Sequence, residues 1–269
     1  MPTVDVNEQV FPAVQRVLYG KAPLFEVVCQ VRFPADLRLE TEPPAMFQQR
    51  VRHLFPILKQ QTKSVLSGLP EEVAKALEVV APPTGTTTTW HFSTEDGKVR
   101  LELVRDNLTQ VSLAYHRWED FFEPYRESID ALVELYDPSF FTRIGLRFRD
   151  LIKRSNLGLE DTPWSELLKP HVLGELAVED VGDRAIEASR NLLLSLPQKG
   201  AKVRLQHGFA DIADSNEQGY LIDCDFFVER TEINHAQEAI QYLHEHAGRY
   251  FQWCITPRLH QAMEPTPMV

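Results

Sequence analysis

Three arginines recur along one short segment of the chain and could together bind an anion. Within residues 140–149, Arg143, Arg147 and Arg149 occupy odd positions, with Gly145 between them. In a strand, neighbouring side chains on one face lie about 7 Å apart. A row of guanidinium groups at this spacing suits phosphate or carboxylate, and Gly145 would leave room for a ligand or a neighbouring backbone. Arg32, on the polar side of another predicted strand, is a further candidate for anion binding.

The arginine row could instead be neutralised by carboxylates of the same sheet. Glu26 and Glu102 occupy the polar sides of their own predicted strands and are the candidate acidic partners. Charges on an exposed sheet face commonly meet opposite charges on the next strand. We therefore favour cross-strand pairing and keep anion binding as the alternative.

A second polar row contains two carboxylates that could bind a divalent metal ion. Asp223 and Asp225 alternate with apolar residues in a predicted strand, and Mg²⁺ or Mn²⁺ prefers such oxygen ligands. The alternative, which we favour, is a solvated face balanced by Arg204 and Gln206, with no cofactor. If two curved sheets lined one cavity, arginines opposite these carboxylates would suit metal-assisted chemistry on phosphorylated or nucleotide substrates.

The histidines and cysteines form no metal-binding motif. His244 flanks the apolar stripe of a predicted helix, which favours a packing role, and His207 is expected to point toward the core. Cys29, Cys224 and Cys254 lie far apart in apolar segments, which predicts buried thiols rather than a disulfide framework.

Periodicity predicts the elements that position these residues. Eight segments have the alternation of apolar residues or the composition and flanking turns of strands, and others have apolar residues at spacings of three and four, which indicates helices. The predicted strands are 24–33, 86–92, 98–105, 109–115, 140–149, 190–196, 201–210 and 220–229. The predicted helices are 46–58, 71–80, 118–136, a short one at 163–168, one from 234 to 254 and a short one after Thr256.

Consecutive strands with tight turns predict an α+β fold with an antiparallel sheet of about eight strands and amphipathic helices on one face. The sheet is either single or split into two related halves, because Lys-Val-Arg-Leu occurs at both 98–101 and 202–205. The predicted organisation is an irregular lead-in at 1–21, an α+β half at 22–152, an acidic connecting segment at 153–183 and a second α+β half at 184–269.

Three blocks of sequence resemble a sporadically distributed family of bacterial proteins, most of them uncharacterised. They are Ala-Pro-Leu-Phe-Glu to Val-Arg-Phe at 22–33, Trp-Glu-Asp-Phe at 118–121 and Phe-Thr-Arg-Ile-Gly-Leu-Arg-Phe at 141–148. The resemblance covers about residues 22–262 and implies the patchy distribution of accessory genes, without an established activity. It departs at Phe148 and Asp150, where a Tyr and an Asn would be expected.

Composition narrows the class of function. The chain has 269 residues, 43% of them hydrophobic, and a net charge of −11, which makes nucleic acid an unlikely general partner. It has no apolar run of the roughly 20 residues that cross a membrane and no signal-peptide start, so a cytoplasmic location is expected.

Common catalytic signatures of hydrolases, nucleotide-binding enzymes and zinc proteases are missing from the sequence. We therefore predict a non-enzymatic binding or adaptor protein of an accessory system such as phage defence or toxin regulation. An unidentified protein partner and homo-oligomerisation, such as a homodimer, are expected, because open sheet edges need covering. The alternative hypothesis is the metal-dependent enzyme described above.

Overall fold

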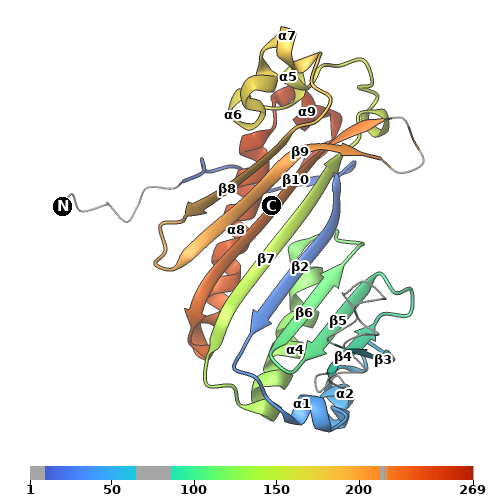
Figure 1. Cartoon of the computed structure of the whole chain (residues 1–269), viewed down its shortest axis with the longest axis vertical. Coiled ribbons are helices and arrows are strands. Elements are labelled where there is room, and N and C mark those ends of the chain that lie inside the picture. The colour runs from blue at the N-terminus through green and yellow to red at the C-terminus, as the bar shows by residue number, and fades with distance from the viewer. Residues whose placement is uncertain (1–9, 65–85, 213–214, 216, 269) are drawn as a thin grey trace, which may run out of the picture.

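A single antiparallel sheet of nine strands organises the molecule (Figure 1). The computed structural model describes residues 10–64, 86–212, 215 and 217–268. Along the sheet the strand order is β3-β4-β5-β6-β2-β7-β10-β9-β8. The strands are β2 (Leu24–Arg32), β3 (Ile57–Ser64), β4 (Thr86–Ser93), β5 (Val99–Val104), β6 (Asn107–Ser112), β7 (Phe141–Ile152), β8 (Ser189–Ser195), β9 (Ala201–Asp211) and β10 (Gln218–Thr231).

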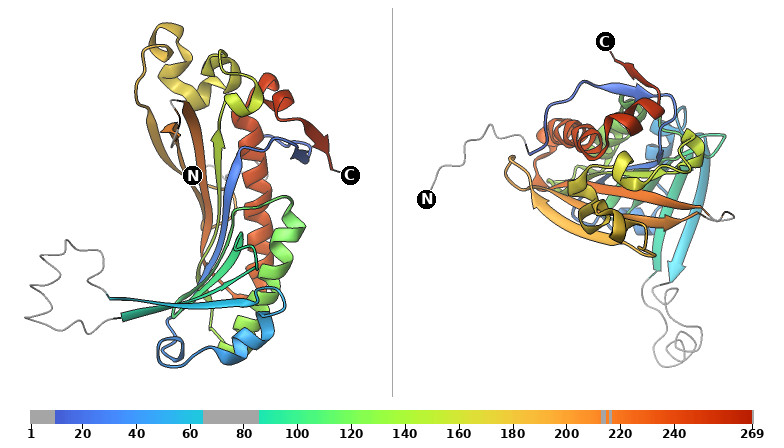
Figure 2. Two further views of the ribbon diagram at one scale, coloured as in Figure 1. Left: turned by 90° about the vertical axis from the view of Figure 1, so that its right-hand side faces the viewer. Right: turned by 90° about the horizontal axis from the view of Figure 1, so that it is seen from above.

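Two long helices, α4 (Trp118–Tyr136) and α8 (Ala236–Cys254), lie on one face of this sheet, and among the described residues no helix covers the opposite face (Figure 2). The apolar stripe of α4 packs onto the sheet because its members recur every three or four residues. The buried Tyr125 also ties α4 to two strands: its hydroxyl donates to the Leu108 carbonyl at 2.7 Å and accepts from the Val31 N–H at 3.0 Å.

The topology repeats once along the chain. β2, the meander β4-β5-β6 and α4 are followed by β7, the meander β8-β9-β10 and α8, and β2 pairs with β7 at the centre of the sheet. The Lys-Val-Arg-Leu copies occupy corresponding places, since each leads into or lies within the middle strand of its meander. The predicted second half continues the same sheet, because β10 pairs with β7 along its length. The pairing runs from Tyr220 opposite Ile152 to Thr231 opposite Phe141.

Smaller elements complete the fold. A two-stranded sheet joins β1 (Val17–Tyr19) to β11 (Pro265–Pro267). Two short helices, α1 (Arg38–Thr41) and α2 (Ala45–Val51), follow β2 in the chain. The remaining helices and 3-10 turns are η2 (Ser155–Leu157), α5 (Trp164–Leu167), α6 (Pro170–Leu173), η3 (Gly174–Ala177), α7 (Glu179–Gly182), η4 (Ile233–His235) and α9 (Pro257–Ala262), of which α5, α6 and α7 gather at one end of the sheet (Figure 1).

The α+β class and the antiparallel sheet are confirmed, and two predicted elements are wrong. The predicted helix at 46–58 ends at Val51, and residues 57–64 form β3, because this segment pairs with β4 along its whole length. The lead-in at 1–21 is not all irregular, since it contains β1 and the buried Phe11. The predicted helix at 71–80 lies outside the described residues. In the part of the chain that the structure describes, none of the helices combines the length and apolar character that a membrane crossing requires.

Candidate functional site

The arginine row lies on the face of the sheet opposite to α4 and α8 and is paired with carboxylates. Arg143 Nη2 donates to both oxygens of Asp225, at 2.8 and 2.7 Å. Arg147 donates from Nε and Nη2 to the two oxygens of Asp223, at 2.7 and 2.5 Å. Arg149 Nη1 donates to Glu26 at 2.9 Å. Each arginine therefore has a carboxylate partner on a neighbouring strand.

Aromatic rings also hold the outer arginines in place. The Arg143 guanidinium lies 4.7 Å from the centre of the Phe227 ring, and that of Arg149 lies 4.9 Å from the centre of the Phe25 ring. The space beside Gly145, which the sequence suggested for a ligand, contains the Arg143 guanidinium instead. With its charges paired and this space filled, the row has the organisation of a structural ion-pair network.

Two expectations about the charged residues need correction. Glu102 does not join the row: it accepts from Arg100 Nε at 2.8 Å and faces His91. Asp223 and Asp225 lie beside the arginines in one sheet, rather than across a cavity between two sheets, because β10 directly pairs with β7. Arg32 stands opposite Arg143 in register and donates to Gln30 at 2.7 Å.

These contacts bear on the hypothesis that Asp223 and Asp225 bind a metal ion, because arginines contact both carboxylates. The carboxylates of Asp223 and Asp225 accept from arginine, although Arg204 and Gln206 stand opposite them on β9. Within the described ranges, no three His, Cys, Asp or Glu side chains come together as a metal ion would require. Asp223, with 6% of its side chain exposed, is instead a buried anchor for Arg147 and Arg149.

A cavity of about 400 Å³ lies on the other face of the sheet, under α8. β7 and β10 contribute Phe148, Asp150 and Cys224, while β1 and the residues before α4 add to its walls. Aromatic and aliphatic side chains predominate, and they include Leu24, Tyr115, Trp118 and Phe251. A largely apolar cavity with few polar groups is the usual form of a small-molecule site.

Asp150 is the polar group that distinguishes this cavity. The residue is only 6% exposed, and no residue in the described part of the chain hydrogen-bonds its carboxyl oxygens. Burial raises the pKa of this carboxyl to about 8, and the negative charge of Asp223 adds to the rise. At neutral pH Asp150 is therefore mostly protonated and uncharged.

His244 lies in the wall of the same cavity and is neutral at physiological pH. Its ring stacks on Trp118 with the centroids 3.9 Å apart, and its Nδ1 atom is buried without a hydrogen-bond partner among the described residues. Burial, and to a smaller extent the charge of Arg16, lower the pKa of His244 to about 3. The expected packing role of His244 agrees with the stacking, and His207 is buried as expected.

Charged side chains at the rim of the cavity are paired with one another. Arg16 and Arg117 both donate to Glu119, at 2.8 and 3.1 Å, and Arg249 lies 3.8 Å from Glu245. These hydrogen bonds, chiefly the one from Arg16, lower the pKa of the Glu119 carboxyl to about 2. Three rim arginines thus share two carboxylates, whereas the Asp150 carboxyl inside the cavity has no ion-pair partner among the described residues.

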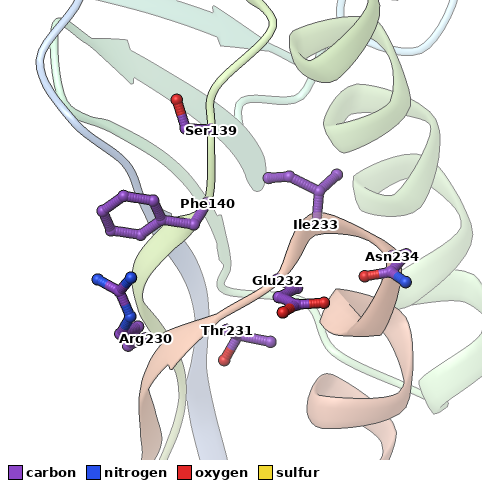
Figure 3. A pocket seen from close by; sticks show the side chains of 7 residues that line it. All are labelled: Ser139, Phe140, Arg230, Thr231, Glu232, Ile233 and Asn234. Carbon is purple, nitrogen blue, oxygen red and sulfur yellow. The ribbon is translucent and has the colours of Figure 1, made fainter.

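A wider groove of about 640 Å³ lies where β10 leads into α8 (Figure 3). Figure 3 shows Arg230 beside Phe140, and its guanidinium lies 4.6 Å from the centre of that ring. Arg230 has a φ of 53°, in the left-handed region, so the backbone turns sharply there. Glu232 lies in the same groove, and this mixture of charges in an open depression does not define a ligand.

The cavity residues were missed because the predicted strand at 140–149 ended before Asp150. β7 continues to Ile152, and Asp150 shares the core-facing register of Ile144, Leu146 and Ile152. A carboxyl in that register is the signal that could have identified the site. No protein-family model matches the chain, and no curated protein matches it significantly.

Proposed function

We propose that this protein is a binding protein for a small organic molecule, held in the cavity between the sheet and α8. The observation that carries the proposal is the Asp150 carboxyl, which is almost fully buried, faces a cavity of about 400 Å³ and has no partner among the described residues. A buried polar group without a hydrogen bond costs about 1–3 kcal/mol. A ligand that bonds to it would recover this free energy on binding.

Apolar contacts would contribute the rest of the affinity. Phe148 and Phe251 contribute aromatic surface to the cavity, and transfer of apolar area from water into it contributes about 25 cal/mol per Å². The arginine network on the opposite face supports the same proposal, since it stabilises the β2, β7 and β10 strands from which the cavity wall is built. A role in an accessory system stays a prediction from the resemblance.

The experiment is a thermal-shift screen of a small-molecule library against matched variants at Gly248. This residue lies on α8 at the cavity wall, and a Cβ atom there would meet nothing within 4 Å. Gly248→Trp should obstruct the cavity, whereas Gly248→Ala should leave it open. We expect compounds that raise the Tm of the wild type and Gly248→Ala but not of Gly248→Trp.

Circular dichroism of both variants establishes that they fold. If no compound shifts the wild type, or if every shift survives in a folded Gly248→Trp protein, the binding proposal is wrong.

A further inference from the structure

We infer that the ligand of this cavity is an organic amine, bound as its ammonium ion against the Asp150 carboxylate with its apolar body among the aromatic side chains. This inference rests on the proposed binding function and names the chemical class of the ligand. It follows from the Asp150 carboxyl, which among the described residues has no ion-pair partner and lies in a cavity lined mainly by apolar side chains. A buried carboxylate is stable only with a cation or several hydrogen-bond donors beside it, and the described chain supplies neither.

The rim arginines do not take this role, because each has another partner. Arg16 and Arg117 bond to Glu119, and Arg249 lies beside Glu245. Their side chains are 46%, 43% and 22% exposed, so water also screens them. An anionic ligand would meet arginines that already contact Glu119 and Glu245, and its charge would oppose the ionisation of Asp150.

The aromatic walls suit the same ligand class. Tyr115 and Phe148 pack edge to face with their centroids 6.0 Å apart, and Tyr19 and Phe251 do so at 5.9 Å. All four residues line the cavity. The face of an aromatic ring attracts a cation within about 6 Å, and this attraction is larger where water is excluded. The rings would therefore assist Asp150 in holding the ammonium group and would also cover a hydrocarbon body.

Binding of an ammonium ion would be coupled to release of a proton. Because its pKa is about 8, the Asp150 carboxyl is mostly protonated at neutral pH, and it must lose its proton to pair with a cation. From the packed elements, the titratable groups around it are Tyr19 on β1, Cys224 and Asp223 on β10, and His244 and Cys254 on α8. Burial keeps the tyrosine, the two thiols and the histidine uncharged at neutral pH.

The charged groups near Asp150 are Asp223, on the opposite face of the sheet, and the side chains at the rim of the cavity. At the rim, His116 adds a titratable group beside Arg16, Arg117, Glu245 and Arg249. Asp150 is thus the group inside the cavity whose proton a bound cation would displace near neutral pH.

Isothermal titration calorimetry with three compounds of one shape tests the inference. We would use 2-phenylethylamine, 2-phenylethanol and phenylacetate at pH 7, where a primary amine of this kind, with a pKa of about 10, is a cation. We expect the amine to bind at least about ten-fold more tightly than the alcohol, and the anion to bind most weakly. Titrations in buffers of different ionisation enthalpy should show release of nearly one proton per amine bound.

Asp150→Asn keeps the shape of the side chain and removes its charge. We expect about a 30-fold or greater loss of amine affinity in this variant, little change for the alcohol, and no proton release. Asp130→Asn is the matched control, since Asp130 is an exposed carboxylate on α4 that pairs with Arg126. Its amine affinity should stay within about two-fold of the wild type.

The outcomes separate this inference from the proposed function. If the alcohol or phenylacetate binds as tightly as the amine, or if Asp150→Asn binds the amine as well as the wild type does, the ammonium inference is wrong and the cavity remains a binding site. The same holds if none of the three compounds binds while the library screen yields neutral or anionic ligands that Gly248→Trp excludes. A screen without any ligand would overturn both proposals.

Discussion

Asp150 and Asp223 lie on adjacent strands, one position out of register, with their carboxyl groups on opposite faces of the sheet. Asp223 stands opposite Arg149, and Asp150 stands opposite Ile222. The charge of Asp223 is the second cause, after burial, of the raised pKa of Asp150. The ion-pair network on one face and the cavity on the other are therefore electrostatically coupled through a single layer of backbone.

Asp223→Asn should lower the pKa of Asp150. The substitution removes a negative charge and leaves the nearby Arg147 and Arg149 guanidinium groups without it, and both changes favour the ionised form of Asp150. Carboxyl ¹³C NMR titration would follow Asp150 directly. Asp225→Asn, one same-face position further along β10, is the control. If the pKa of Asp150 shifted equally in both variants, the specific effect of Asp223, which lies next to Asp150 in the strand register, would be contradicted.

Asp150→Asn should remove a pH dependence from the free energy of unfolding. The pKa of Asp150 is about 8 in the folded protein and near 4 in an unfolded chain, so between these values the folded state binds more protons. This carboxyl therefore contributes most stability at low pH, and the contribution falls by about 1.4 kcal/mol per pH unit as the pH rises toward 8.

Urea unfolding between pH 5 and pH 9 measures this effect. The stability of Asp150→Asn relative to the wild type should increase steadily over the range and level off above pH 8. Parallel stability curves for the two proteins would show that Asp150 ionises normally.

Arg147→Ala should destabilise the protein by about 2 kcal/mol, because it removes two charge-assisted hydrogen bonds from the buried Asp223. The loss is moderated by Arg149, which stays 3.3 Å from the same carboxylate. Arg100→Ala is the control: its partner Glu102 is more exposed, at 25% against 6% for Asp223, so a loss below about 1 kcal/mol is expected. Equal losses in chemical denaturation would argue against a structural role for the row.

Gly248→Ala should stabilise the protein by about 1 kcal/mol, because glycine inside a helix costs conformational entropy and a Cβ at this position meets no atom within 4 Å. Gly97→Ala is a matched comparison, since its surroundings are equally open but its φ is +69°. That conformation disfavours alanine, so this variant should be less stable than the wild type. Thermal unfolding of both variants would test the argument, and the opposite order of Tm values would refute it.

Local patterns predicted many of the elements that carry the site. In β7, alternation placed Arg143, Arg147 and Arg149 on one face and Ile144 and Leu146 on the other, as observed. Helical spacing likewise predicted α4 over its full length. Strand β3 was missed because Leu58 continues the spacing of the preceding helix, while the pairing of residues 57–64 with β4 is a long-range contact.

Partner choice and burial depend on contacts between segments distant in sequence. Glu26 and Glu102 have the same polar-side pattern in the sequence, yet only Glu26 stands opposite Arg149, because β2 and not β5 is the neighbour of β7. Asp150 is an ordinary carboxyl in the sequence. It acquires a pKa of about 8 because α8, β1 and the segment before α4, which are remote along the chain, bury it and reduce its contact with water.

Periodicity reflects the geometry of a single strand or helix, so the amino-acid sequence alone is enough to predict it. Strand order, counter-ion choice and the cavity arise only when separate segments pack against one another. The free energy of that packing depends on contacts across the whole sheet, so no single segment determines it.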